Sequence, residues 1–136
     1  MKIEILLIAA LLIFGVACAS QGKATAEMKS VDYQTFAKKI KSGDVPIIDV
    51  RTPEEYAAGH IPGAINIDAS AEGFEQEICQ FDKSKPLAIY CRSGRRSKEA
   101  AERIMSKGYD VIELDKGIRS WEGEIEIPAE QSIRVE

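Results

Sequence analysis

Short apolar runs alternate with amphipathic stretches from Val31 onward. The apolar runs are typical of strands buried on both faces, and they lie at 46–50, 64–67, 87–90 and 111–114. Stretches with helical periodicity lie at 33–42, 53–58, 74–80 and 95–107, and a last short helix is predicted to carry Trp121. Strands that alternate with helices indicate an α/β domain with a parallel sheet covered on both sides.

The helix at 53–58 has a clear start signal. Thr52 can cap it, Pro53 suits the first helical position, and Glu55 completes a capping box with Thr52. The chain is therefore expected to turn into a helix directly after the strand at 46–50.

Residues 1–19 differ from the rest of the chain. They have a short charged start, an apolar run and then small residues, which predicts a secretory signal too short for a transmembrane helix. Cleavage after Ala19 fits an A-x-A site, whereas Cys18 resembles the lipid-modified cysteine of a bacterial lipoprotein. We expect an exported, periplasmic protein that is either soluble or tethered to the membrane at Cys18.

The remaining boundaries follow from composition. Residues 20–29 are small and polar and predict a linker, residues 30–128 form one domain, and residues 129–136 form a C-terminal extension. The 136 residues carry a formal net charge of −4, and 45% of them are hydrophobic. That length can bury a real core, and the net acidity argues against nucleic acid as a partner.

The chain has three cysteines, one histidine and no Cys-x-x-Cys pair. These are too few for a disulfide scaffold or a structural zinc site, although one bridge between Cys79 and Cys91 is possible. We expect no metal, no cofactor and a monomer.

Cys91 combines a strand end with a helix start. It follows the strand at 87–90, and ligands of open α/β sheets bind at the carboxyl ends of the strands. The chain then turns through Gly94 into the N-terminus of a helix, where backbone N–H groups and the helix dipole attract an anion. Both effects favour the thiolate, which is the nucleophilic form of cysteine.

Three arginines add positive charge to the same loop: Arg92, Arg95 and Arg96. Because cations at a helix N-terminus oppose the helix dipole, a bound anion is the natural reason for them. Two reaction classes fit a thiolate in such a loop: sulfur transfer through a persulfide, and phosphate or arsenate chemistry.

Three stretches carry a family resemblance: "CRSGRRS" (91–97), "IIDVRTPEEYAAGHIPGAINI" (47–67) and "LDKGIRSW" (114–121). On these motifs the chain resembles the single-domain rhodanese family. That family usually has two glycines where this chain has Lys116 and Gly117. The loop from Cys91 to Arg96 is C-x4-R, whereas the related cysteine phosphatases use C-x5-R, so its length favours sulfur over phosphate.

The resemblance implies a rhodanese-like three-layer fold, with a central parallel sheet of about five strands flanked by helices. It also implies a thiosulfate sulfurtransferase with Cys91 as the catalytic residue. Cys91 would take a sulfane sulfur from thiosulfate or a similar donor, with a persulfide-carrying protein as a further partner, and pass it to a thiol, or to cyanide in an assay. The predicted substrate-binding residues are Arg92, Ser93, Gly94, Arg95 and Arg96. The alternatives are a phosphatase or arsenate reductase on the same fold and a non-catalytic rhodanese-like binding module.

Other polar residues near the motifs have structural interpretations. Asp49 and Arg51 are expected to hold the loops, by bonding to each other or to nearby backbone. Ser97 is expected to help cap the helix after the Cys91 loop, and His60 to pack in a turn. Cys79 lies outside the motifs and is expected to be an inert or half-buried thiol, with a resolving role as the alternative.

Overall fold

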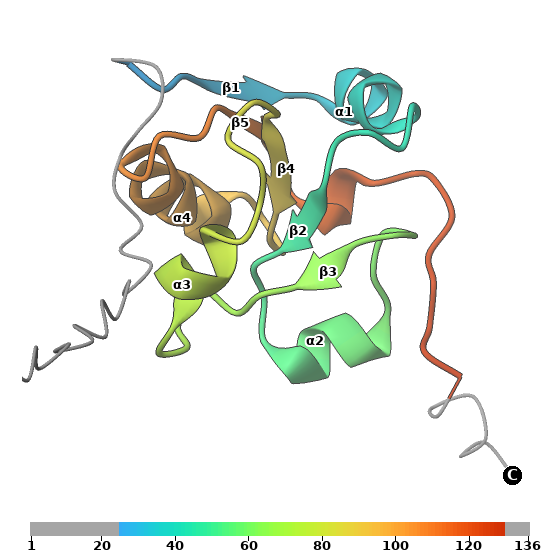
Figure 1. Cartoon of the computed structure of the whole chain (residues 1–136). Coiled ribbons are helices and arrows are strands. Elements are labelled where there is room, and N and C mark those ends of the chain that lie inside the picture. Colours follow the sequence, from blue (N-terminus) through green and yellow to red (C-terminus); the bar gives the residue numbers. More distant parts are fainter. Residues whose placement is uncertain (1–24, 130–136) are drawn as a thin grey trace, which may run out of the picture.

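The computed structural model describes residues 25–129, in which strands alternate with helices as predicted (Figure 1). The strands are β1 (Met28–Val31), β2 (Ile47–Asp49), β3 (Ile65–Asn66), β4 (Leu87–Tyr90) and β5 (Val111–Leu114). The helices are α1 (Tyr33–Ile40), α2 (Pro53–Ala58), α3 (Phe74–Ile78), α4 (Arg95–Met105) and the 3-10 helix η1 (Ile118–Ser120). Strands β4 and β5 have the predicted bounds, whereas β1 includes two residues of the predicted linker, Met28 and Lys29.

All five strands form one parallel sheet in the order β1-β5-β4-β2-β3. Strand β4 lies at its centre, and all four residues of β4 are buried. A parallel sheet needs helices on both faces, because its strands are apolar on both sides. The predicted fold class is confirmed.

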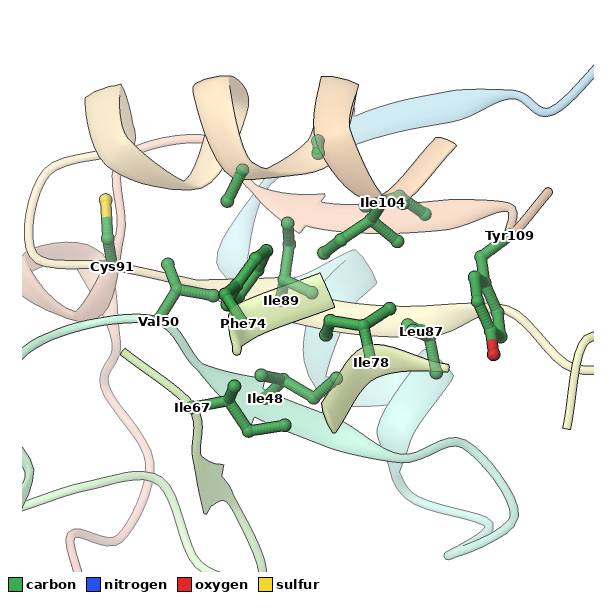
Figure 2. Close-up of a cluster of buried hydrophobic side chains, with 13 residues drawn as sticks. Ile48, Val50, Ile67, Phe74, Ile78, Leu87, Ile89, Cys91, Ile104 and Tyr109 are labelled. Carbon is green, nitrogen blue, oxygen red and sulfur yellow. The ribbon is translucent and has the colours of Figure 1, made fainter. Parts of the chain in front are cut away.

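Alternate side chains of β4 face different helical layers. Ile89 packs with Phe74 of α3 and Ile104 of α4 on one face (Figure 2). Tyr90 packs with Phe36 of α1 on the other face. Each fully buried side chain of this size contributes about 1.5–3 kcal/mol to folding, so the two layers hold β4 firmly from both sides.

The last predicted helix is the 3-10 helix η1, and Trp121 follows it directly. The Trp121 ring meets Tyr33 edge-on at a centroid distance of 5.0 Å and Phe36 at 6.3 Å. Trp121 is half-buried and packs η1 against α1, one residue beyond the helix that was predicted to carry it.

The capping box of α2 is present as predicted. The Thr52 hydroxyl accepts a hydrogen bond from the Glu55 N–H, and the Glu55 carboxylate accepts one from the Thr52 N–H. This cap fixes where the chain turns after β2, and so places α2 beside the carboxyl edge of the sheet.

The predicted signal at 1–19, with both of its candidate processing sites, lies outside the described residues. Within residues 25–129, no helix is long and apolar enough to cross a membrane.

Candidate active site around Cys91

Cys91 directly follows β4, at the carboxyl edge of the sheet, where the loop that leads into α4 begins (Figure 2). The Cys91 side chain is only 1% exposed and continues the row of core side chains that begins at Leu87. Cys91 is a free cysteine, so it does not form the bridge to Cys79 that the sequence allowed.

The loop closes around the Cys91 sulfur. The Gly94 N–H donates to Cys91 Sγ at 3.1 Å, and Ser97 Oγ lies 3.4 Å from the same sulfur. Gly94 has a φ of 100°, and a Cβ at this position would overlap the Asp115 carbonyl oxygen. A glycine is therefore required here, because no larger residue fits this close approach between backbone segments.

The segment after β5 holds the other side of the loop. The Ile118 N–H donates to the Cys91 carbonyl at 2.9 Å, and the Arg119 N–H donates to the Arg92 carbonyl at 3.2 Å. A Cβ at Gly117 would overlap both of these carbonyl groups. Lys116 is exposed, which explains why a side chain is tolerated where the family usually has a first glycine.

The three arginines of the loop have different surroundings. Arg92 and Arg95 are exposed, and Arg95 has only a long contact of 3.7 Å with Glu99. Arg96 instead binds both carboxylate oxygens of Glu55, at 2.7 and 2.8 Å. Arg96 thus braces the loop against α2, while Arg92 and Arg95 remain available to an anion.

The Arg96 guanidinium also changes the acidity of its partner. Its hydrogen bond holds the pKa of Glu55 at about 2, below the ordinary 4.5, and this exceeds the opposing effect of burial. The same hydrogen bond raises the pKa of Arg96. The pair is therefore fully ionised at neutral pH.

Two open recesses flank the loop. One, of about 410 Å³, is lined by Ser93, Lys116, Arg119 and Ser120. The other, of about 160 Å³, lies between the start of α4 and the segment after β2, and Arg96 is among its lining residues. Cys91 lines neither of these two recesses. The first recess lies next to the tip of the Cys91 loop, because the exposed Ser93 lines it. Its other lining residues include two cations, Lys116 and Arg119.

Asp49 and Arg51 are buried and bond to each other. Arg51 Nη2 lies 2.6 Å from Asp49 Oδ2 and 2.8 Å from the Gly59 carbonyl. Burial by itself would lower the pKa of Arg51, but its bonds to Asp49 raise it on balance. Asn66 bridges the backbone carbonyls of both residues at 3.0 and 2.9 Å. The pair thus fixes the turn between β2 and α2.

The hydrogen bonds described for Cys91 Sγ involve Gly94 and Ser97, and neither His60 nor Cys79 takes part in them. The His60 ring stacks on Tyr56 at 3.8 Å, and its Nδ1 lies 3.1 Å from the Tyr56 carbonyl. Cys79 is half-buried at the C-terminus of α3. The predicted packing role suits the surroundings of His60.

One residue of the site was missed from the sequence. Glu113 of β5 is fully buried, and its carboxylate accepts from Ser97 Oγ at 2.6 Å and from Ser30 Oγ at 2.6 Å. The expectation that Ser97 caps α4 is wrong, because the N-cap is Gly94 and no side chain caps this helix. Ser97 instead connects Glu113 to Cys91. The available signal was a charged residue inside a strand predicted to be buried on both faces.

The family model of the rhodanese-like domain matches residues 32–124. The chain belongs to the rhodanese-like family. This confirms the resemblance that the three sequence motifs indicated, and the matched range includes the Cys91 loop.

Two curated relatives come from Bacillus subtilis (strain 168). "Putative sulfurtransferase YtwF" is 31% identical over 99 residues, which cover 72% of this chain and 94% of that protein. "Putative sulfur carrier protein YrkF" is 34% identical over 98 residues, which cover 71% of this chain. The match spans only 52% of YrkF, about half of its length. One name refers to sulfur transfer and the other to sulfur carriage.

Solved structures agree with the fold. A rhodanese-like domain protein from Staphylococcus aureus is 33% identical, with a TM-score of 0.66, and the match covers 75% of this chain and all of that one. The rhodanese-like domain thus accounts for most of the described chain.

Proposed function

We propose that this rhodanese-like domain is a sulfurtransferase that carries a sulfane sulfur as a persulfide on Cys91. One observation carries the proposal: Cys91 Sγ lies within a six-residue loop at the start of α4 and accepts a hydrogen bond from the Gly94 N–H at 3.1 Å. A backbone donor aimed at a sulfur stabilises negative charge there, both on a thiolate and on the outer sulfur of a persulfide. The names of the two Bacillus relatives support sulfur handling.

The chemistry requires two half-reactions. The Cys91 thiolate attacks the outer sulfur of thiosulfate, a sulfur–sulfur bond forms at Cys91, and the sulfur–sulfur bond of the donor breaks. Sulfite leaves with the bonding electron pair, and Cys91 becomes a persulfide anion. A thiol acceptor then takes the outer sulfur, its proton neutralises the transferred persulfide, and the Cys91 thiolate is restored. No oxidant or cofactor enters this balance.

The exposed cations of the loop suit an anionic donor. Arg92 and Arg95 are exposed at the loop surface, whereas Arg96 is bound to Glu55. The recess beside Ser93 adds Lys116 and Arg119 along the approach to the loop. A doubly charged donor is attracted by such a group of cations more strongly than a neutral one.

The test is the intact mass of the protein after incubation with thiosulfate. We expect a gain of one sulfur atom, which is lost when cyanide is added and appears as thiocyanate. Cys91→Ser should gain no sulfur, whereas Cys79→Ser keeps Cys91 and should still gain one sulfur atom. Thiocyanate formation that persists in Cys91→Ser would overturn the proposal. Cys91-dependent hydrolysis of aryl phosphates without any sulfur gain would favour the phosphatase alternative.

We further propose that the chain is exported to the periplasm, on the basis of the signal pattern at 1–19. The protein is purified from cells that express the full chain, and its mass distinguishes the two predicted processing routes, cleavage after Ala19 and lipid modification at Cys18. Cleavage after Ala19 gives an unmodified polypeptide in the soluble periplasmic fraction. Processing at Cys18 gives a lipid-modified protein in the membrane fraction, and Cys18→Ala should abolish that modification. Recovery of the uncleaved chain from the cytoplasm would contradict export.

A further inference from the structure

A buried carboxylate that the proposed chemistry does not use lies beneath the first turn of α4. Glu113 has no solvent-exposed surface. It is two residues after Val111 in β5, so both side chains are on the same face of the sheet, the face that α4 covers. Ser97 of α4 donates to Glu113 Oε1 at 2.6 Å, and Ser30 of β1 donates to Oε2 at 2.6 Å. Both distances are typical of hydroxyl groups bound to an ionised carboxylate.

These bonds set the direction of the contact between Ser97 and Cys91. A hydroxyl group has a single proton, and Ser97 Oγ lies closer to Glu113 Oε1, at 2.6 Å, than to the Gly94 carbonyl oxygen, at 3.1 Å, so the shorter bond takes the proton. The lone pairs of Ser97 Oγ are therefore left for Cys91 Sγ, which lies 3.4 Å away and donates. The hydrogen bonds run in one direction, from the Cys91 thiol through Ser97 to the Glu113 carboxylate.

The cations around Glu113 do not fully compensate its charge. Lys98 Nζ lies 3.4 Å from Glu113 but 2.9 Å from Asp115, so two carboxylates share one ammonium group. Burial by itself would lower the pKa of Lys98, but its bonds to Asp115 and Glu113 raise it on balance, and it stays charged. Arg96, the neighbouring cation on α4, is bound to Glu55. Arg96 also acts on Cys91 by its charge, but Glu113 itself has only the shared Lys98 as a cation partner among the described residues.

We propose that Glu113, acting through Ser97, is a positioning residue that holds the resting Cys91 sulfur as a thiol and sets the pH at which it becomes reactive. The carboxylate opposes a thiolate by its charge, and it turns Ser97 into an acceptor toward the sulfur. The inference rests on the proposed function only in taking Cys91 as the nucleophile. A thiol is oxidised more slowly than a thiolate, which suits a cysteine proposed to work outside the cytoplasm.

The experiment measures the rate at which iodoacetamide alkylates Cys91 as a function of pH, read by mass spectrometry on the Cys91 peptide. Glu113→Gln removes the charge and keeps the shape. The pH midpoint of alkylation should fall by about one unit, equivalent to about tenfold faster alkylation below the midpoint. Asp115→Asn is the matched control, because it removes the other carboxylate that shares Lys98 but has no bond to Ser97. Its midpoint should stay within about 0.3 units, since an exposed charge is screened.

A double-mutant cycle separates the role of Ser97 from simple bracing. In the native background Ser97 accepts from the thiol, so Ser97→Ala should not raise the midpoint. In the Glu113→Gln background the neutral amide is a weaker acceptor, and the Ser97 proton can turn toward the thiolate. Ser97→Ala should then raise the midpoint. An equal effect in both backgrounds would contradict the coupling.

A Glu113→Gln midpoint equal to or above the native value would overturn the inference. Lys98→Gln is a second test of the inference, in case Glu113→Gln does not fold. The Lys98 side chain is 40% exposed, so its replacement should be tolerated. Loss of the ammonium group strengthens the field of Glu113, so the midpoint should rise, and an unchanged or lower midpoint would again contradict the inference. Alkylation needs no sulfur donor. Failure to form a persulfide with thiosulfate would therefore count against the proposed function alone.

Discussion

The Arg96 guanidinium binds both carboxylate oxygens of Glu55, with Nη1–Oε1 and Nη2–Oε2 distances of 2.7 and 2.8 Å. The two residues are 41 positions apart, and each also belongs to a local structure: Glu55 to the capping box of α2, and Arg96 to the first turn of α4. This one pair connects the helix after β2 to the Cys91 loop. A two-point pair restricts orientation more than a single contact does.

Glu55→Gln should change how stability depends on pH. Arg96 holds the pKa of Glu55 at about 2, against an ordinary 4.5, so the ionised pair stabilises the fold above about pH 4.5 and loses that contribution as the pH falls toward 2. The variant should lose about 1 kcal/mol at neutral pH, a modest value because the pair is partly exposed and screened. Urea unfolding across this pH range measures it. Glu54→Gln, in the same helical turn, should keep the native acid dependence.

Gly117→Ala should distort the Cys91 loop by direct contact, although Gly117 lies outside the loop in the sequence. A Cβ at Gly117 would overlap the carbonyl groups of Cys91 and Arg92, and the residue has a φ of 64°. We expect a loss of about 2–3 kcal/mol in the free energy of unfolding, together with an altered alkylation rate at Cys91. Lys116→Ala is the control at the adjacent exposed position and should stay within about 0.5 kcal/mol. Equal stabilities of the two variants would show that the close approach of Gly117 to the Cys91 and Arg92 carbonyl groups does not constrain the loop.

The sequence predicted the sheet better than the polar network. Buried runs such as 87–90 and 111–114 are recognised because every residue of a central parallel strand is covered. The Cys91 loop is recognised because its motif is local. The pair of Glu55 with Arg96 joins residues far apart in the sequence, and a capping box already explained Glu55. Glu113 was overlooked for a related reason: its partners come from β1 and α4, and only the folded sheet brings them together.

Asp49→Ala should be strongly destabilising. It leaves the Arg51 guanidinium buried without a carboxylate, bonded to the Gly59 carbonyl and lying over the Tyr90 ring. Removing one partner of a buried ion pair costs about 3–5 kcal/mol, and urea unfolding measures the loss. The double variant Asp49→Leu with Arg51→Met removes both charges and should recover part of that loss. If the double variant is less stable than Asp49→Ala alone, the hydrogen-bonded geometry of the pair matters more than its charge balance.

Arg92→Ala and Arg95→Ala should each raise the KM for thiosulfate about two- to fivefold, with kcat nearly unchanged. Both side chains are exposed cations at the mouth of the loop, so they attract the donor without touching the transferred sulfur. The effect should shrink as salt is added and with a singly charged thiosulfonate donor. Lys85→Ala makes the same charge change just before the amino end of β4, at the opposite edge of the sheet, and should leave KM unchanged. A fall in kcat at constant KM for Arg92→Ala would instead place that guanidinium at the reacting sulfur atoms, because only interactions stronger in the transition state than in the bound complex change kcat.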